Sequence, residues 1–412
     1  MTNGSDGVSA PGAAQTDTTE TEHRMTQQVR LGIIGFGQQG SMYARFIAEG
    51  QVPSMVVGAI ADIDAARRDA ASAAHPEAEV FDDHLALLDS GLVDAVVTAV
   101  PHYLHPEMGI EALRRDIHAL VEKPAGVYTK QVAELNAFAA TKPEVRFGLM
   151  FNQRNNPLYQ RIKEIVDAGE IGSVLRSNWI ITTWWRPQGY YDSSAWRATW
   201  GGEGGGVLVN QAPHQLDLWQ WICGVPEKVF AKVSYGFRRD IAVEDEVTAL
   251  VDYGNGATGV FVTATHDLVG TDRFEILGDA GKIVVEGSRT ATVTRLAKPE
   301  RELSAGMSPE DVARLFTGQL DASELYATET IEFDSAWGGQ HSGVLENFAQ
   351  SILGEEELLA PGEEGILGVR LANAIHLSSW LGREVSIDFD EDEFLRALND
   401  RIAAEGTYPT RG

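Results

Sequence analysis

The 412-residue sequence contains a single cysteine, Cys223, and no run of about 20 consecutive apolar residues. One cysteine excludes an intrachain disulfide and any metal site built from several thiolates. Cys223 ends an apolar stretch that begins at Trp219, a setting that favours a packed thiol over a nucleophile. Because no apolar run is long enough, the sequence offers no candidate membrane-spanning helix.

Positive charge is also scarce. Lys and Arg number 33 against 60 Asp and Glu, which gives a formal net charge of −27 at pH 7. Nucleic acids and anionic lipids are bound by clustered positive charge, so the composition argues against both and favours a neutral or cationic ligand. Residues 1–28 are rich in small and polar residues and lack the apolar core of a signal peptide, which predicts a disordered tail on a cytoplasmic protein.

Residues 29–154 alternate short β-branched runs with helical stretches. This is the pattern of βαβ units, in which parallel strands are joined by helices. We expect helices at 41–49, 105–115 and 130–140. Strands are expected at 29–34, 56–61, 93–100, 118–122 and 145–150. The first half is therefore predicted to be an α/β domain with a parallel sheet.

Residues 155–390 change to longer strands with alternating polarity and hairpin turns, after a helix at 158–168. This pattern predicts a second, α+β domain with a large, mainly antiparallel open sheet. Strands are expected at 174–185, 229–237, 247–253, 258–265, 273–277 and 282–285, and helices at 341–353 and 363–381. The acidic segment 298–335 has mixed character and receives no assignment. Residues 391–412 are expected to form a helical tail.

A glycine-rich turn follows the first expected strand. It has the form G-x-G-x-x-G and opens a helix, the setting in which such a motif holds a dinucleotide. The first glycine permits the tight turn, the second lets the backbone approach a pyrophosphate, and the third allows close packing of helix on strand. The motif consists of Gly35, Phe36, Gly37, Gln38, Gln39 and Gly40.

Asp62 closes the second expected strand. A carboxylate at this place accepts hydrogen bonds from the adenosine ribose, so the pair of features favours a dinucleotide site over a plain turn followed by a helix cap. The same carboxylate repels a 2′-phosphate, which favours NAD over NADP. Arg67 and Arg68 oppose that preference, but the helical pattern assigns them to an exposed face.

Lys123 stands at the end of another expected strand, in the run Glu122-Lys123-Pro124. In open α/β sheets, ligands gather beyond the carboxyl ends of the strands, so Lys123 is directed at the crevice. Only eight of the 33 basic residues are lysines. Unlike arginine, a buried lysine can lower its pKa and exchange a proton near neutrality, which makes Lys123 a candidate catalytic residue.

These elements together resemble the glucose–fructose oxidoreductase/inositol dehydrogenase/MocA family. The resemblance rests on the glycine motif, Asp62, the segment 101–105 and the Glu-Lys-Pro run, and it extends over about residues 29–390. It implies a Rossmann domain, NAD as cofactor, hydride transfer at a secondary hydroxyl of a sugar or polyol, and a homodimer or homotetramer. The further cofactor contacts that it implies are Pro101, His102, His105, Glu122 and Lys123.

The stretch 204–219 resembles the glycine-led helix that carries catalytic residues in that family. Asn210 and His214 lie four residues apart, so on a helix they share one face, with Asp217 three residues further on. The resemblance implies that His214 faces Lys123 across the substrate. One of the two then removes the hydroxyl proton and the other binds the developing carbonyl oxygen. We expect His214 to be the base and Lys123 the positioner and proton relay.

Two positions depart from the family pattern. Many members carry aspartate where this chain has Asn210, whose amide can bind a substrate hydroxyl but cannot stabilise an imidazolium by charge. Many also carry asparagine where this chain has His102, which affects the expected contacts with the nicotinamide. His105 is expected to begin the next helix, and a structural role and a ligand contact are both open for it.

Aromatic residues concentrate in one segment. Seven of the nine tryptophans fall between Trp179 and Trp221, and residues 184–200 interleave aromatic and polar side chains. Flat rings with polar edges suit the apolar faces and hydroxyl edges of a sugar, although the same residues also suit a subunit interface. Besides Lys123, Asn210 and His214, the candidate substrate contacts are Arg186, Tyr191, Asp192, Trp196 and Arg197.

Two other classes would use the same elements. An enzyme that cleaves a glycoside or epimerises a sugar oxidises one carbon transiently with bound NAD, and net release of NADH separates it from a dehydrogenase. A non-catalytic NAD-dependent regulator is a third class, and the presence of both Lys123 and His214 weighs against it. No metal is expected, because histidines such as His266 lack paired spacing and hydride transfer needs none. The fold cannot name the sugar.

Overall fold

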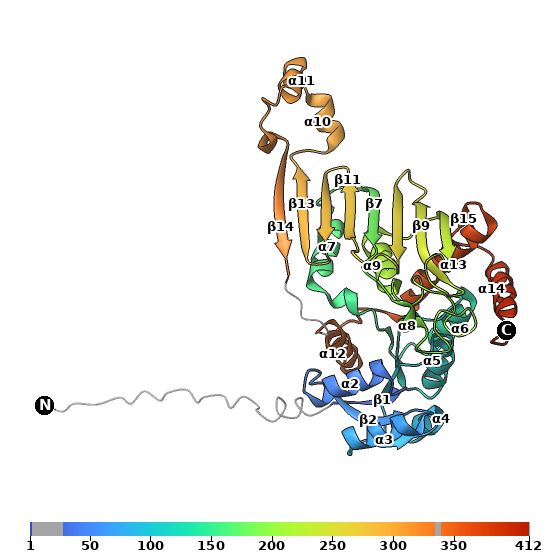
Figure 1. Cartoon of the computed structure of the whole chain (residues 1–412). Helices are drawn as coiled ribbons and strands as arrows, with labels where there is room; N and C mark the ends of the chain where they lie inside the picture. Colours follow the sequence, from blue (N-terminus) through green and yellow to red (C-terminus); the bar gives the residue numbers. More distant parts are fainter. Residues whose placement is uncertain (2–27, 334–338, 412) are drawn as a thin grey trace.

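The computed structural model describes residues 1, 28–333 and 339–411, so the tail predicted for residues 1–28 lies outside the described residues except at its two ends. Residues 29–149 form a six-stranded parallel sheet with the order β3-β2-β1-β4-β5-β6 (Figure 1). This is the Rossmann order, whose reversal at β1 leaves a crevice at the carboxyl ends of β1 and β4. The strands are β1 (Val29–Ile34), β2 (Met55–Ala61), β3 (Glu79–Phe81), β4 (Ala95–Thr98), β5 (His118–Val121) and β6 (Phe147–Leu149).

Helices cover both faces of this sheet because the strands are apolar on both sides. Ile33 packs into the core layer beneath one set of helices, and its neighbour Ile34 packs into the layer on the opposite face. The predicted Rossmann domain is thereby confirmed. Its helices are α2 (Gln38–Ala48), α3 (Ala65–Ala74), α4 (His84–Asp89), α5 (His105–Arg114) and α6 (Thr129–Ala139), with the short 3-10 helices η1 (His102–Leu104) and η2 (Asn152–Asn155).

The second sheet has nine strands in the order β14-β13-β12-β11-β7-β10-β9-β8-β15. All neighbouring pairs are antiparallel except β7 and β10, which run parallel, so the predicted mainly antiparallel sheet is confirmed. The strands are β7 (Val174–Ile181), β8 (Lys228–Tyr235), β9 (Glu244–Asp252), β10 (Thr258–Ala264), β11 (Asp272–Gly278), β12 (Gly281–Glu286), β13 (Thr290–Leu296), β14 (Tyr326–Glu332) and β15 (Val385–Ser386).

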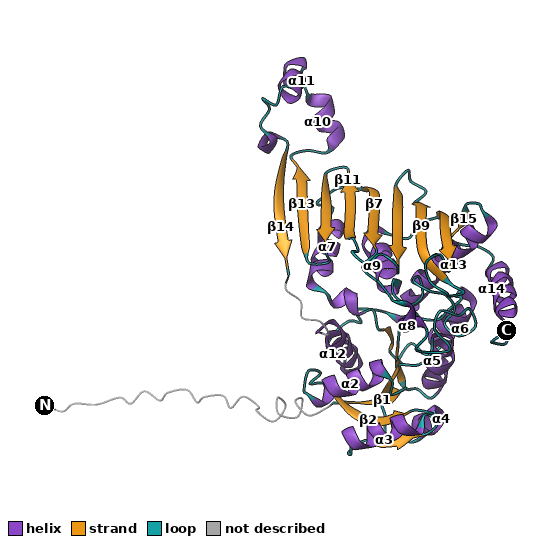
Figure 2. Cartoon of the chain, viewed as in Figure 1, coloured by secondary structure: helices purple, strands orange, loops and turns teal. Residues whose placement is uncertain are grey.

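One face of the second sheet is covered by helices, and the other is open (Figure 2). The strands alternate accordingly: in β8 every second side chain is buried, while Phe230 is exposed. The covering helices are α7 (Pro157–Asp167), α9 (Pro213–Cys223) and α13 (Gly365–Leu381), and the short helices α8 (Gln188–Tyr191) and η4 (Gly362–Glu364) lie in connecting loops. The segment between β13 and β14 forms an arm that carries α10 (Glu300–Gly306), α11 (Pro309–Phe316) and η3 (Ala322–Glu324).

Helix α12 (Gly339–Leu353) departs from the expected division of the chain at residue 154. It follows the second sheet in sequence, yet Val344, Leu345 and Phe348 enter the core beside α2 and β1. An amphipathic helix must bury its apolar face, and here the matching surface belongs to the Rossmann domain. The chain therefore crosses between the two domains again after residue 333.

The C-terminal tail is packed against the second domain. Helix α14 (Glu391–Glu405) buries Phe394, Leu398 and Ile402 in that core. Beyond this, the Glu405 carboxylate accepts hydrogen bonds from the backbone N–H groups of Trp200 and Gly201, both at 3.0 Å. The last helix thus holds the loop that leads into the glycine-rich stretch 204–206.

Candidate functional site

The glycine turn lies between β1 and α2, as the motif predicts. Gly35 has φ +94°, and a Cβ atom there would lie 2.4 Å from the carbonyl oxygen of Ala99. A Cβ at Gly40 would lie 1.9 Å from the Gly35 carbonyl oxygen. Gly37 precedes α2 without a side-chain cap, so the first N–H groups of the helix stay available to an anion. The turn therefore has the shape and the donors that a pyrophosphate requires.

Asp62 follows β2 directly and is buried beside this turn. Its Oδ2 accepts a hydrogen bond from the Phe36 backbone N–H at 2.7 Å, and its Oδ1 accepts one from Asp64 N–H at 2.9 Å. Arg67 is exposed, as the helical pattern predicts, yet its guanidinium lies 3.5 Å from the Asp62 carboxylate. The carboxylate predicted to bind the ribose thus has a half-exposed cation beside it.

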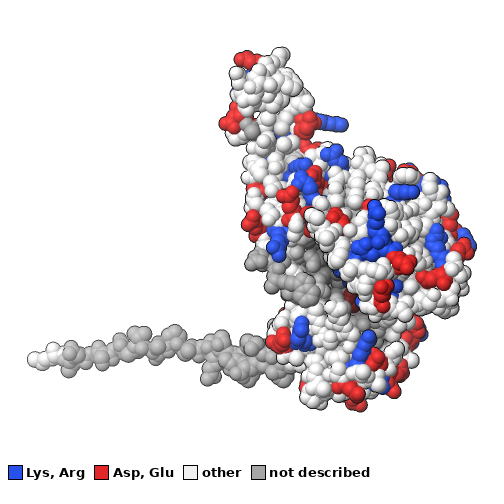
Figure 3. Space-filling model, viewed as in Figure 1, with Lys and Arg blue, Asp and Glu red and all other residues white. Residues whose placement is uncertain are grey.

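A cavity of about 630 Å³ joins the glycine turn to the second domain. Figure 3 shows acidic and basic side chains interspersed on the visible face and a hollow between the two domains. Despite the acidic composition of the chain, the cavity wall carries more cations than carboxylates. It is lined by Gly37, Gln38, Gln39, Arg67, Ala99, Val100, Pro101, His102, His105, Glu122, Lys123, Arg186, Tyr190, Ser193, Ser194, Trp196, Arg197 and Asn210.

Lys123 follows β5 and lies in the wall of this cavity. Its Nζ donates a hydrogen bond to the backbone carbonyl of Asn210 at 3.0 Å, which links the two domains. Burial lowers the pKa of Lys123, while the carboxylates of Glu122 and Glu203 raise it and Arg197 lowers it further. The lysine therefore has an ammonium group whose proton is easier to remove than that of an exposed lysine.

Glu122 holds the strand end that carries Lys123. Its carboxylate accepts a short hydrogen bond from the Tyr43 hydroxyl and another from the Lys123 backbone N–H at 2.9 Å. Burial raises the pKa of Glu122, against the lowering effect of Lys123 and these hydrogen bonds. His105 fixes the other side of the turn, because its ring nitrogens lie 2.7 Å from the Pro124 carbonyl oxygen and 2.8 Å from that of Val100.

His214 lies in the first turn of α9 and is not among the residues that line the cavity of about 630 Å³. Burial lowers the pKa of His214 well below the ordinary value, and the nearby charges of Lys123 and His341 lower it further. Its Nδ1 is buried and has no hydrogen-bond partner among the described residues. His214 is consequently a neutral imidazole at pH 7.

The spacing predicts Asn210 and His214 on one helix, but Asn210 lies outside it. Helix α9 begins at Pro213, and Asn210 lies in the turn before it. Its side-chain amide donates a short hydrogen bond to Glu203 Oε1, and the hydroxyl of Tyr190 lies 3.4 Å away. Its backbone carbonyl, not its side chain, contacts Lys123. His102 is held nearby, with Nδ1 3.1 Å from the Glu203 carbonyl oxygen.

The aromatic segment contributes Tyr190, not Tyr191, to the cavity. Tyr191 turns into the core, where its hydroxyl donates to Thr265 Oγ1 at 2.9 Å. Asp192 also lies outside the cavity wall and accepts a hydrogen bond from Gln188 at 3.0 Å. The expected residues Arg186, Trp196 and Arg197 do line the cavity, and both guanidinium groups lie over the Tyr190 ring, at 5.2 Å and 4.6 Å from its centroid.

Asp217 belongs to a separate buried network. Its carboxylate binds the Arg154 guanidinium through two hydrogen bonds of 2.9 Å and 2.7 Å, and Glu364 binds the same guanidinium. Arg154 is 2% exposed and Asp217 is 4% exposed. The pair joins η2 to α9 and so fixes the helix that carries His214.

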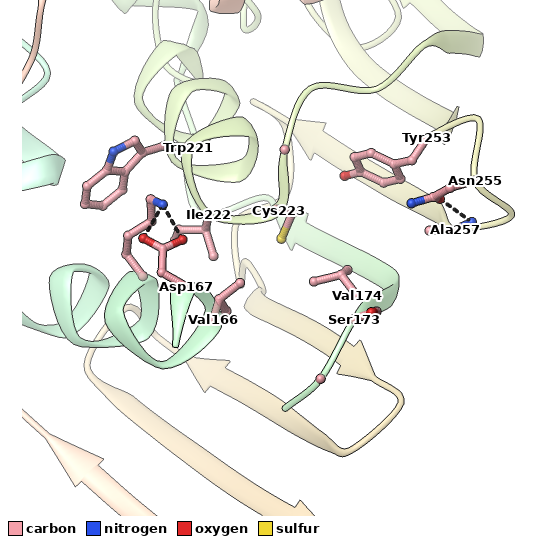
Figure 4. A pocket seen from close by; sticks show the side chains of 13 residues that line it. Val166, Asp167, Ser173, Val174, Trp221, Ile222, Cys223, Tyr253, Asn255 and Ala257 are labelled. Carbon is pink, nitrogen blue, oxygen red and sulfur yellow. Dashed lines mark hydrogen bonds and ion pairs between the residues drawn. The ribbon is translucent and has the colours of Figure 1, made fainter. Parts of the chain in front are cut away.

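A second cavity, of about 430 Å³, lies at the far end of α9 (Figure 4). Trp221, Cys223 and Tyr253 line it, and Lys163 at its edge is already paired with both oxygens of Asp167 at 2.6 Å. Burial raises the pKa of the Cys223 thiol to about 12, so the thiol stays protonated and unreactive at neutral pH. This cavity has none of the proton-transfer groups of the first.

The described part of the chain contains no group of three or more His, Cys, Asp or Glu side chains placed to hold a metal ion. Within the same residues, no helix is long and apolar enough to cross a membrane.

The fold and the site define an NAD-binding oxidoreductase with a Rossmann domain and a second domain built on a mixed sheet. Comparison with family models agrees for both halves. Residues 29–149 match the oxidoreductase family with NAD-binding Rossmann fold, and residues 159–284 match the GFO/IDH/MocA C-terminal domain. The chain belongs to the GFO/IDH/MocA family of oxidoreductases.

Similar proteins include the oxidoreductase YrbE of Bacillus subtilis (strain 168), 27% identical over 376 residues that span 89% of this chain and 99% of that protein. Inositol 2-dehydrogenase 2 of Saccharopolyspora erythraea is 27% identical over 340 residues, 77% of this chain and 91% of that protein.

Among solved structures, the WlbA dehydrogenase of Bordetella pertussis in complex with NADH and UDP-GlcNAcA has a TM-score of 0.73 and 26% identity, covering 89% of this chain and 99% of that one. Levoglucosan dehydrogenase in complex with NADH and levoglucosan has the same fold, with a TM-score of 0.73 and 20% identity over 88% of this chain and all of that one.

Proposed function

We propose that this protein uses NAD to oxidise a secondary hydroxyl of a sugar, polyol or glycoside, or to reduce the corresponding carbonyl. One observation carries the proposal: a single cavity connects the glycine turn that fits a dinucleotide to Lys123 and to an aromatic, hydrogen-bonding wall from the second domain. The names of the relatives support it, because two of them are an inositol dehydrogenase and a dehydrogenase complexed with NADH and a nucleotide sugar.

The Rossmann residues fit NAD. The turn from Gly35 to Gly40 and the uncapped start of α2 would hold the pyrophosphate, and Asp62 would accept hydrogen bonds from the adenosine ribose. Pro101, His102 and His105 would border the nicotinamide end, where they line the cavity. When bound, NAD supplies the acceptor for the hydride that leaves the substrate carbon.

His214 and Lys123 divide the proton chemistry. His214 is neutral because burial lowers its pKa, so its imidazole can take the proton of the substrate hydroxyl as the carbonyl forms. Lys123 can donate a hydrogen bond to the same oxygen, which holds the hydroxyl in place and stabilises developing negative charge. In the reverse direction, His214 returns the proton. Lys123, whose Nζ reaches the cavity and the Asn210 carbonyl, relays protons toward solvent.

The second domain would bind the rest of the sugar. Trp196 and Tyr190 offer ring surfaces to its C–H faces, and Arg186, Arg197, Ser193 and Ser194 offer donors to its hydroxyls. The binding wall therefore combines flat apolar surface with hydrogen-bonding groups on the side of the cavity opposite the glycine turn.

The proposal can be tested by incubating the purified protein with a panel of sugars, inositols, anhydrosugars and glycosides. Each compound is assayed once with NAD and once with NADP. Reduced nicotinamide is followed by absorbance, and Lys123→Ala and His214→Ala are assayed in parallel. Turnover with NAD that both substitutions abolish is the expected result. If NAD binds but no panel member yields reduced cofactor, product analysis of the same mixtures decides between an enzyme that cycles bound NAD while cleaving or epimerising its substrate and a non-catalytic regulator.

A further inference from the structure

Position 210 lacks the carboxylate that many members of the family carry there, yet a carboxylate lies directly behind it. Glu203 is 2% exposed and comes from the loop before the glycine stretch. Its Oε2 accepts a hydrogen bond from the Ala198 backbone N–H at 2.6 Å, and its Oε1 accepts the short hydrogen bond from the Asn210 side chain. Burial raises the pKa of Glu203, while these two hydrogen bonds and the charges of Arg197 and Lys123 lower it in turn, so the N–H donors partly offset the cost of burying the ionised carboxylate.

Asn210 connects this carboxylate to Lys123. The side-chain amide of Asn210 is fixed by Glu203, and its backbone carbonyl receives the Lys123 Nζ hydrogen bond at 3.0 Å. Glu203 itself does not line the cavity, whereas Asn210 and Lys123 do. Glu203 therefore acts on the site from behind its wall and has no contact with a ligand in the cavity.

The charges around Lys123 make a second carboxylate necessary. The groups that face it are the carboxylates of Glu122 and Glu203, the guanidinium of Arg197, and the imidazoles of His102, His105, His214 and His341. Glu203 also senses a neighbouring buried carboxylate, Glu244. Burial lowers the pKa values of these four histidines, so they provide no negative charge and little positive charge at pH 7. Only the two carboxylates offset the desolvation of the Lys123 ammonium.

We propose that Glu203 is a positioning residue that replaces the carboxylate missing at position 210: it holds Asn210 so that its carbonyl receives Lys123, and it supplies the charge that keeps Lys123 protonated. Its role in catalysis rests on the proposed function, whereas its effect on Lys123 is independent of any turnover.

An exchange of charge between the two positions tests this. In Glu203→Gln the negative charge is lost, and Asn210 can turn its amide over to keep one hydrogen bond. In the double variant Glu203→Gln/Asn210→Asp, an amide and a carboxylate again form the hydrogen bond, but the carboxylate is now at position 210 and the amide at position 203. A merely structural role for Glu203 predicts no restoration by this exchange, because the loop geometry around Ala198 is unchanged between the two variants.

The readout is the pH dependence of carbamylation of Lys123 by cyanate, measured on the NAD-free protein by peptide mass spectrometry. Only the unprotonated amine reacts, so the rate profile follows the protonation of Lys123 without requiring a substrate. The profile for Lys123 is expected to move toward acid by about one pH unit in Glu203→Gln and to return in the double variant. Lys130, an exposed lysine paired with Asp392, is the internal control and keeps its profile.

A Lys123 profile that does not move in Glu203→Gln, or that the double variant does not restore, overturns the proposal. If Glu203→Gln does not fold, Asn210→Asp alone decides: a third carboxylate beside Lys123, added to Glu122 and Glu203, must move the profile toward alkali, and an unchanged profile contradicts the inference. If the profiles move as expected but no sugar is turned over by the native protein, the proposed function fails and the role of Glu203 stands. If the native protein turns over a sugar but the profiles do not move, the proposed function stands and the role of Glu203 fails.

Discussion

Arg154 and Lys123 both carry a positive charge inside the molecule, but their hydrogen-bond partners differ. The Arg154 guanidinium is directed at the carboxylates of Asp217 and Glu364 and lines neither of the two cavities described above. Lys123 donates a hydrogen bond of 3.0 Å to a neutral backbone carbonyl and lines a cavity of about 630 Å³. Buried charge alone therefore does not mark a functional site. The site is marked by hydrogen-bonding capacity that the fold leaves unused.

The largest expected effect is the loss of turnover in Lys123→Met. This change removes the donor to the reacting oxygen, so kcat should fall by roughly 10²–10⁴-fold. Because the ammonium is costly to bury, stability should be kept. Steady-state kinetics test the fall in kcat, and thermal melting tests the unchanged stability. A variant with normal kcat and a lowered melting temperature would show that Lys123 is structural and not catalytic.

Arg154→Met should show the opposite behaviour. It leaves Asp217 as an unpaired buried carboxylate, and the free energy of unfolding should fall by about 3–5 kcal/mol, measured by chemical denaturation. The matched control is Arg161→Met, which breaks a half-exposed pair with Glu164 and should cost no more than about 1 kcal/mol. Equal losses in the two variants would show that the Arg154 network is not the anchor of α9.

Glu244→Gln tests how the glycine stretch is fixed. The Glu244 carboxylate accepts hydrogen bonds from the N–H groups of Gly206 and Leu208 at 2.7 Å and 2.9 Å. Glutamine can accept only one of them and turns an N–H group toward the other, so we expect a loss of about 1–3 kcal/mol in unfolding free energy. Hydrogen exchange at Gly206 and Leu208 should rise at the same time, and unchanged exchange would argue against this anchoring.

The pH profile gives a smaller but directional test. His214 must be neutral to accept a proton, so oxidation is lost as the pH falls through its pKa. Burial and the nearby Lys123 lower the pKa of His214, and the acid limb of kcat should therefore lie well below 6.5, the ordinary value of histidine. A limb at or above that pH would mean that another group is the base.

Arg67→Ala should have the smallest effect. The guanidinium at 3.5 Å from Asp62 partly offsets the charge that repels a 2′-phosphate. Its removal should raise the ratio of kcat/KM for NAD over NADP severalfold, with Arg68→Ala as the control because Arg68 binds only backbone carbonyls of residues 62 and 63. A lower ratio of kcat/KM for NAD over NADP in Arg67→Ala would mean that Arg67 helps to bind NAD.

The parallel sheet and the cofactor turn could be predicted because each depends on local signals. Runs of β-branched residues define the strands, and the spacing of Gly35, Gly37 and Gly40 defines the turn. The placement of α12 could not be predicted in this way. Its periodicity shows that it is an amphipathic helix but does not show which domain offers the matching apolar surface.

The site residues of the second domain are harder to predict, because their positions also depend on how distant segments pack. Asn210 was expected on a helix because it lies four residues before His214, but Pro213 fits the first turn of a helix and sets the start of α9 after Asn210. The choice between Tyr190 and Tyr191 depends on the rotation of the one-turn helix α8, which no periodicity reveals. Glu203, in a run of glycines, has the sequence of a surface loop, and only the packing of distant segments buries it.

The contact between the end of the chain and the site loop has a practical consequence. Glu405 binds the N–H groups of Trp200 and Gly201, and the Arg411 guanidinium binds the Gly201 carbonyl, three residues before the glycine stretch. A purification tag fused after residue 412 would therefore begin next to the loop that carries Glu203.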